Sequence, residues 1–259
     1  MKKSSLKDTF EQAASENYWG DVDSVSGPGS NMADTRVIRR EIPGLLRRYQ
    51  IKSMLDAPCG DLFWMKEILP EIIEQGITYT GADIVPGLIE KHQHFFKDER
   101  MRFHVLDLTK DKVPAADLVL TRDCFIHLSY RNIYKILNNY KSSGITYLLT
   151  NTYTNDSRVN HDVDGVFLWG RMLNMQKFPF YFPRPLEIIV EECTQDNGEF
   201  MDKCLALWKI RDLNLGSLLI NIGLCDLKRV SGKLDAKARA VYRKGKSGIK
   251  KFFPGTRPI

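Results

Sequence analysis

Short apolar runs alternate with amphipathic segments through the middle of this 259-residue chain. Apolar and β-branched runs of four to six residues predict strands, and apolar positions spaced three or four apart predict helices. The predicted strands are 52–56, 78–83, 101–106, 117–121 and 145–150, and the predicted helices between them are 62–75, interrupted by Pro70, 86–97 and 130–140. This alternation predicts a doubly wound α/β fold, in which helices cover both faces of a mostly parallel sheet.

The pattern differs before the first strand. Residues 1–20 predict a helical lead-in, and a turn-rich loop follows at 24–31. A helix is then expected to run toward Tyr49, with Ser30 or Asn31 as its cap. We expect Pro43 to kink or divide that helix, because proline lacks the N–H that the helical bond requires.

The pattern also changes after the fifth strand. Residues 151–185 form a long segment rich in aromatic, polar and proline residues, and connections of this length usually serve a function. Two more strands are predicted at 186–190 and 204–210, joined across residues 195–198. They could pair as an antiparallel hairpin at the sheet edge, giving seven strands in all.

Composition indicates an ordinary globular protein, since 43% of the residues are hydrophobic. No apolar run approaches the roughly 18 residues of a membrane span, and no secretory signal is visible at the start. The five cysteines are scattered without Cys-x-x-Cys spacing, which argues against a zinc site and is typical of reduced thiols. We therefore expect a cytoplasmic protein.

Positive charge is concentrated at the end of the chain. Residues 228–259 contain 11 Lys or Arg and one acid, a surplus of +10, so the remainder carries −4 of the overall +6. Such a tail suggests an anionic partner: a membrane surface, to which the protein would bind peripherally, a nucleic acid or an acidic glycan. A solvated tail without a partner is the equally weighted alternative.

Three predicted strands end in acids, Asp56, Asp83 and Asp107. The first leads into the turn Ala57-Pro58-Cys59-Gly60-Asp61, whose glycine would let the backbone approach a ligand beside a helix amino terminus. Capping of the following helices could explain any one of these acids. Three together favour a ligand that is positively charged and rich in hydroxyl groups.

These residues carry a resemblance to class I S-adenosylmethionine (SAM)-dependent methyltransferases over roughly residues 52–210. Asp56–Asp61 resembles the first motif of that family, although Ala57 and Cys59 stand where small residues or glycine are usual. The runs 81–84, 105–108 and 117–128 resemble the second, third and fourth motifs. The resemblance implies SAM as cofactor and these binding residues: Asp56, Ala57, Cys59, Gly60, Asp61, Asp83, Ile84, Asp107, Leu108 and Arg122.

Roles follow from the resemblance and from the chemistry of adenosine. Asp83 would accept both ribose hydroxyls, and Asp107 would accept the adenine amine. Arg36, on the helix before the first strand, would pair with the methionine carboxylate. A dinucleotide dehydrogenase is the structural rival. It would need G-x-G-x-x-G after the first strand, and acids in this turn would repel pyrophosphate.

Methyl transfer to a hydroxyl generally needs a base that removes a proton. Three residues are candidates for the catalytic group: His127 just after the fourth strand, Asp123 beside it, and His161 in the long loop. The ordinary pKa of histidine suits such a base near neutrality. Each could instead be a packed structural residue or a solvent-exposed residue of a loop. The spacing of acids and histidines does not require a metal, and we predict none.

The sequence thus predicts three parts: a helical lead-in with a cofactor-covering loop (1–51), a SAM-binding domain (52–212) with a substrate loop (151–185), and a basic extension (213–259). The predicted activity is O-methylation of a carbohydrate, glycan or other small hydroxylated acceptor, because the fourth motif lacks the Pro-Pro-aromatic run of many amine methyltransferases. Two alternatives stay open. One is an RNA methyltransferase anchored by the tail, and the other is a non-catalytic SAM-binding adapter.

Overall fold

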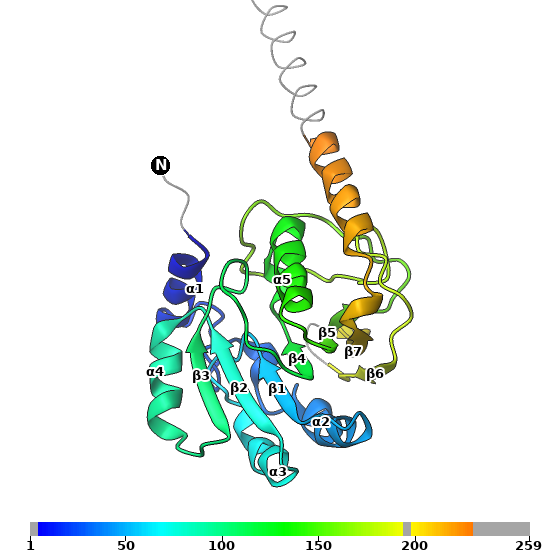
Figure 1. Cartoon of the computed structure of the whole chain (residues 1–259). Coiled ribbons are helices and arrows are strands. Elements are labelled where there is room, and N and C mark those ends of the chain that lie inside the picture. The colour runs from blue at the N-terminus through cyan, green and yellow to red at the C-terminus, as the bar shows by residue number, and fades with distance from the viewer. Residues whose placement is uncertain (1–4, 194–197, 230–259) are drawn as a thin grey trace, which may run out of the picture.

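The computed structural model describes residues 5–193 and 198–229. Within these ranges the chain forms one seven-stranded sheet in the order β3-β2-β1-β4-β5-β7-β6 (Figure 1). The strands are β1 (Ser53–Asp56), β2 (Thr78–Asp83), β3 (Met101–Val105), β4 (Leu118–Thr121), β5 (Tyr147–Tyr153), β6 (Glu187–Val190) and β7 (Lys203–Lys209).

The sheet has a parallel part and an antiparallel part. Strands β1 to β5 pair in parallel, whereas β7 lies antiparallel to both β5 and β6. This arrangement confirms the predicted doubly wound sheet and its antiparallel hairpin. Residues 195–197 of the predicted hairpin connection lie outside the described residues. Because β1, β2, β3 and β4 are parallel, the polar residues at their carboxyl ends gather at one edge of the sheet.

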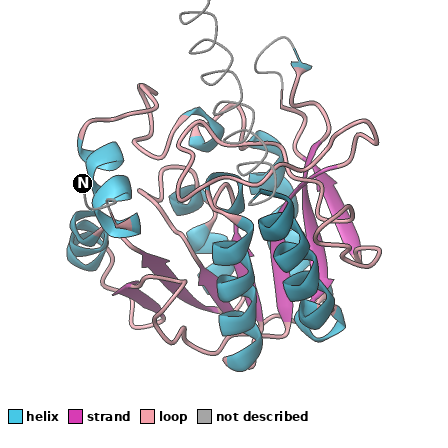
Figure 2. Cartoon of the chain, turned by 90° about the horizontal axis from the view of Figure 1, so that it is seen from above, coloured by secondary structure: helices cyan, strands magenta, loops and turns pink. Residues whose placement is uncertain are grey.

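Helices lie on both sides of the sheet (Figure 2). Alternating strand residues enter two apolar cores, as the pleat requires: Leu55 packs into one and its neighbour Met54 into the other. The α-helices are α1 (Leu6–Ser15), α2 (Arg36–Arg48), α3 (Leu69–Glu74), α4 (Pro86–Phe95) and α5 (Tyr130–Ser142), followed by a helix at 215–229; short 3-10 turns occur at Pro28–Ser30, Met65–Glu67, Phe125–His127 and Ile210–Asp212.

The two prolines that were expected to interrupt helices behave differently: the segment around Pro70 is divided, as predicted, whereas Pro43 does not divide its helix. The predicted helix 62–75 is a 3-10 turn followed by α3, because Leu62 has a left-handed backbone (φ +57°) and Pro70 lies in the first turn of α3. Conversely, α2 continues through Pro43, which is buried with Ile42 and Leu46. Burial of that apolar face offsets the one missing backbone bond.

The start of α2 also differs from the prediction. The helix begins at Arg36, five residues beyond Asn31. Asn31 instead caps a separate turn, in which its side-chain oxygen accepts the Asp34 N–H at 2.9 Å. The lead-in helix is α1, and its cap is Ser5, which forms a reciprocal capping box with Asp8. None of the described helices is long and apolar enough to cross a membrane.

Candidate functional site

A cavity lies at the carboxyl ends of β1, β2, β3 and β4. The segment before the first strand contributes Phe10, Trp19 and Ser26 to its wall, so distant parts of the chain enclose it. The residues predicted from the sequence that line this cavity are Asp56, Cys59, Gly60, Asp61, Asp83, Ile84, Asp107, Leu108, Arg122, Asp123 and His127.

Asp83 is buried at the end of β2 and is held by backbone donors. Its Oδ2 accepts the Gly60 N–H at 2.9 Å, and its Oδ1 accepts the Val85 N–H at 3.0 Å. Burial raises the pKa of Asp83, although these hydrogen bonds act in the opposite direction. Each carboxylate oxygen can accept a further bond, so Asp83 keeps capacity for hydroxyl groups of a ligand.

Asp56 is buried at the end of β1, where its Oδ2 accepts the Tyr79 hydroxyl at 2.6 Å. Burial raises the pKa of Asp56 to about 7, and the charge of Asp83 acts in the same direction. Within the described part of the chain, no Lys or Arg forms an ion pair with Asp56 or Asp83. This side of the cavity is therefore suited to a positively charged ligand.

Asp107 follows β3, and its carboxylate is bonded by residues two and three positions further along the chain. Its Oδ1 accepts the backbone N–H and hydroxyl of Thr109, at 3.0 and 2.6 Å, and its Oδ2 accepts Lys110 Nζ at 2.7 Å. Partial burial would raise the pKa of Asp107, but the bonds from Lys110 and Thr109 outweigh it and lower the pKa. Asp107 thus presents an ionised carboxylate at the cavity edge.

Asp61 anchors the segment Ser24–Ser26 over the cavity. Its two oxygens accept the Ser24 hydroxyl at 3.0 and 2.9 Å, the Ser26 hydroxyl at 3.2 Å and the Val25 N–H at 3.0 Å. Gly60 makes this approach possible, since a Cβ there would lie 2.4 Å from Ser26 Oγ. The Gly60 backbone is left-handed, with φ +57°, which glycine adopts without strain.

His127 lies at the rim of the cavity in a fixed tautomer. Its Nδ1 is 3.0 Å from the Phe167 carbonyl oxygen, which can only accept, so Nδ1 carries the proton. The rings of Phe10 and Trp19 pack beside it at 6.1 and 5.7 Å between centroids. Burial lowers the pKa of His127, so the ring is neutral at pH 7 and Nε2 has a lone pair.

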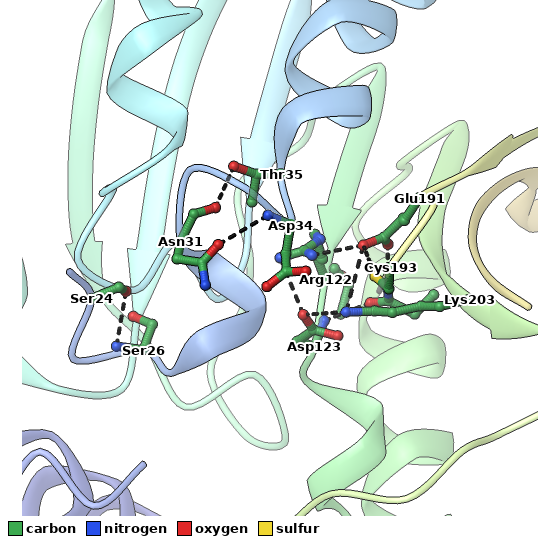
Figure 3. Close-up of polar contacts among 12 residues, drawn as sticks. Ser24, Ser26, Asn31, Asp34, Thr35, Arg122, Asp123, Glu191, Cys193 and Lys203 are labelled. Atoms are coloured by element: carbon green, nitrogen blue, oxygen red, sulfur yellow. Dashed lines mark hydrogen bonds and ion pairs between the residues drawn. The ribbon is translucent and has the colours of Figure 1, made fainter. Parts of the chain in front are cut away.

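A buried ionic cluster is formed by Arg122, Asp123, Glu191 and Lys203 (Figure 3). Two of these residues, Arg122 and Asp123, also line the cavity. Arg122 contacts Glu191 at 2.7 Å and Asp123 at 3.1 Å, and Lys203 Nζ contacts Asp123 at 2.9 Å and Glu191 at 3.5 Å. The Glu191 side chain is fully buried, and its Oε1 accepts Asn151 Nδ2 at 2.8 Å. Two cations face two carboxylates, so these four charges cancel, and the buried Asp34 lies next to Arg122 and Asp123 (Figure 3).

The cluster fixes the charge of Asp123. Burial alone would raise its pKa, but Arg122 and Lys203 outweigh burial and lower the pKa of Asp123. The residue has a left-handed backbone, with φ +49°, and its N–H donates to Asn151 Oδ1 at 2.6 Å. A carboxylate stabilised in this way is a weak base.

Three residues predicted for the site lie elsewhere. Ala57, the first residue of the turn, is fully buried in an apolar core and does not line the cavity. Arg36 forms an exposed ion pair with Glu192 at 2.7 Å and does not line the cavity. His161 is exposed in the loop after β5 and likewise lies outside the cavity lining. The roles predicted for Arg36 and His161 therefore have no support from their positions.

Sequence comparisons find no matching family model and no matching curated protein. Comparison with solved structures finds 1,6-didemethyltoxoflavin-N1-methyltransferase of Burkholderia thailandensis, with bound 1,6-didemethyltoxoflavin and S-adenosylhomocysteine (SAH), at TM-score 0.51 and 13% identity. The match covers 79% of this chain and 86% of that one. The pyocyanin biosynthetic protein PhzM matches at TM-score 0.50 and 16% identity, over 68% of this chain and 55% of that one.

The chain has the fold of class I SAM-dependent methyltransferases. At these identities the similarity establishes the fold alone, and the reaction depends on the residues of the site. The chain spans about half the length of two of these structures, 55% of PhzM and 52% of human N-acetylserotonin methyltransferase, which matches at TM-score 0.47 and 16% identity.

Several polar residues of this methyltransferase fold were missed at the sequence level. Glu191 follows β6 and Lys203 begins β7, so only the antiparallel pairing brings them to Arg122. His92 of α4 is buried, and its Nε2 is 2.7 Å from the Gly60 carbonyl oxygen. A polar residue flanking a predicted strand was the signal available for Glu191 and Lys203. His92 gave no such signal.

Metal ligands do not gather anywhere in residues 5–193 and 198–229. No group of three or more His, Cys, Asp or Glu side chains is arranged there to hold a metal ion.

Proposed function

We propose that this protein is a SAM-dependent methyltransferase that transfers a methyl group to a hydroxyl of a small molecule, with a carbohydrate or glycan as one acceptor class. The proposal rests on one observation: a single cavity contains two carboxyl groups without an ion-pair partner among the described residues, Asp56 and Asp83, and a neutral histidine, His127. The two carboxyl groups suit a sulfonium cation, and the histidine can accept a proton.

Two orphaned polar atoms support the fit to SAM. Arg122 Nε and Asp123 Oδ1 are buried without a hydrogen-bond partner in the described part of the chain, and both residues line the cavity. An unpaired buried donor or acceptor is costly. A ligand with an α-amino-acid end would satisfy both atoms, because its carboxylate accepts from Arg122 Nε and its ammonium donates to Asp123 Oδ1.

The remaining lining matches the rest of that ligand. Asp83 would accept the ribose hydroxyls through the capacity that its two backbone bonds leave. Ile84 and Leu108 would contact the adenine ring, and Asp107 would accept its amine. Gly60 and Cys59 would line the methionine portion. When bound, SAM supplies an electrophilic methyl on a positively charged sulfur.

His127 is the best candidate for the base. The Phe167 carbonyl fixes Nδ1 as the protonated nitrogen, which leaves Nε2 to accept the acceptor's hydroxyl proton. Asp123 is disfavoured because Arg122 and Lys203 lower its pKa. His161 is disfavoured because it is exposed and does not line the cavity. Of the three predicted catalytic residues, His127 alone combines position with basicity.

The first test of the proposal is ligand binding followed by transfer. Calorimetry should detect SAM and SAH binding, and labelled methyl from SAM should appear in a small-molecule fraction of a cell extract. Binding without transfer to any acceptor would favour the non-catalytic adapter. Label recovered in RNA, with none in small molecules, would favour the nucleic-acid alternative.

The second test isolates the base. His127→Asn keeps an amide donor for the Phe167 carbonyl but removes Nε2, so we expect kcat to fall by about 10²–10⁴ while SAH affinity is unchanged. The wild-type rate should decline only below the ordinary histidine pKa of about 6.5, because the pKa of His127 is lowered. Full activity of His127→Asn would exclude His127 as the base.

A further inference from the structure

The helix at 215–229 has two apolar stripes on opposite sides. The inner stripe contains Leu215, Leu218 and Ile222, all buried in the core beside α5. The outer stripe contains Ile220, Leu224 and Leu227, which are 67%, 47% and 67% exposed. Spacings of four and three residues place these outer side chains on one face of the helix, roughly opposite the buried one.

The outer stripe is not explained by packing within the described chain. Isolated exposed apolar residues are common, but three in register on one helix face form a continuous strip. The inner stripe already accounts for how the helix attaches to the domain. The outer stripe is therefore available to something outside the described fold.

Charge decides which occupant fits. The helix leads, in the sequence, into a segment of marked positive charge: residues 228–259 carry a surplus of +10. A second copy of this chain would bring an equal positive charge against the first and be repelled. Nucleic acid would match the charge, but its surface is dominated by charged phosphates and sugars, so most of an aliphatic strip of Ile and Leu would gain no apolar partner. An anionic lipid surface offers both negative headgroups and an apolar layer.

We propose that the outer stripe, Ile220, Leu224 and Leu227, inserts into the interfacial layer of an anionic membrane, with the basic segment that follows binding the headgroups. Combining one apolar and one electrostatic contribution gives reversible surface attachment. This proposal is independent of the methyltransferase chemistry, because none of these residues lines the cavity.

Contacts of the helix link the proposed docking surface to the candidate site. Arg229 pairs with Asp162 at 2.9 Å, and Asn221 Nδ2 donates to the Pro179 carbonyl at 2.9 Å. Both partners belong to the loop after β5, whose Phe167 contacts His127. A docked helix would therefore hold that loop, and the rim of the cavity, close to the lipid surface.

The test is co-sedimentation of the full chain with vesicles. Wild-type protein should bind phosphatidylglycerol-containing vesicles at low salt and bind pure phosphatidylcholine vesicles far less. Its binding to the anionic vesicles should weaken as the salt concentration rises. The triple variant Ile220→Gln, Leu224→Gln, Leu227→Gln keeps helix-compatible side chains and should lose at least about tenfold in affinity. A matched control, Val22→Gln, Phe95→Gln, Met201→Gln, replaces three exposed apolar residues elsewhere and should bind like wild type.

Each other outcome overturns the proposal. If wild-type protein does not bind anionic vesicles at low salt, there is no docking. If the helix variant binds as tightly as wild type, the stripe is not involved and charge alone explains attachment. A dimer that dissociates in the helix variant would assign the stripe to a second copy, and tight binding of a test RNA that prevents vesicle binding would assign the basic segment to nucleic acid. Circular dichroism verifies that both variants are folded.

Discussion

Carboxylates are buried in two neighbouring regions of this molecule, and their partners differ between the two regions. Asp56 and Asp83, at the ends of β1 and β2, receive a hydroxyl or backbone N–H groups, and their pKa values are raised. In the buried ionic cluster, Asp123 and Glu191 are paired with Arg122 and Lys203, and the pKa of Asp123 is lowered.

The difference separates buried carboxylates that lack a cation from carboxylates that have one. A carboxylate without a cation favours a positively charged ligand, whereas a paired carboxylate is already ionised and gains less from one. Within the described residues, the cluster joins the end of β4 to β6 and β7 and leaves only Arg122 Nε and Asp123 Oδ1 for the proposed donor, whereas Asp56 and Asp83 lie on the side of the site that has no cation. Removing a charge from the cluster should therefore lower the free energy of unfolding. Neutralising Asp56 should raise it, and neutralising Asp83 should weaken ligand binding.

The largest expected effect is on the cluster. Lys203→Met leaves two buried carboxylates with one cation, and we expect the free energy of unfolding to fall by about 3–5 kcal/mol. Urea denaturation measures this change. Adding Glu191→Gln restores the balance of charge and should recover part of the loss. A loss below about 1 kcal/mol for Lys203→Met would mean that the cluster is not a structural unit.

The second effect is pH-dependent and has the opposite sign. The unfolded chain releases the Asp56 proton near pH 3.8 and the folded protein near 7, so this group makes wild-type stability fall as pH rises between those values. Asp56→Asn cannot ionise. Relative to wild type it should therefore gain up to about 4 kcal/mol between pH 4 and pH 8. A difference that does not change with pH would contradict the raised pKa.

The third effect concerns the ligand. Asp83→Asn removes a charge and an acceptor, and we expect SAM affinity to fall by about 10- to 100-fold in calorimetry. SAH lacks the sulfonium charge, so its affinity should fall less than that of SAM. Equal losses for both ligands would show that Asp83 acts through hydrogen bonding alone.

The smallest expected effect is at Arg36. Its pair with Glu192 is exposed on both sides, so Arg36→Ala should change stability by less than about 1 kcal/mol. SAM affinity should be unchanged, since Arg36 lies outside the cavity lining. The variant also serves as the exposed-pair control for Lys203→Met. A marked loss of SAM affinity would restore the role first predicted for Arg36.

The sequence predicted what depends on local order along the chain. Asp56, Asp83 and Asp107 each follow a strand, and parallel strands bring such residues to one edge by necessity. Glu191 and Lys203 were missed because their meeting with Arg122 depends on how β6 and β7 pair. Arg36 was misplaced because the helix period gives the face of α2 but not the direction of a long side chain at its start. Leu62 was misassigned because an apolar residue gives no sign of a left-handed backbone.

The bonds of Asp61 to Ser24, Val25 and Ser26 have a kinetic consequence for the proposed reaction. They hold Val25 and Ser26, two residues of the cavity wall, against the turn that follows β1. If SAH leaves the proposed site past this segment, these bonds would have to open before it departs. Ser24→Ala removes one of them and would then speed turnover when product release is the slow step, while weakening retention of the donor.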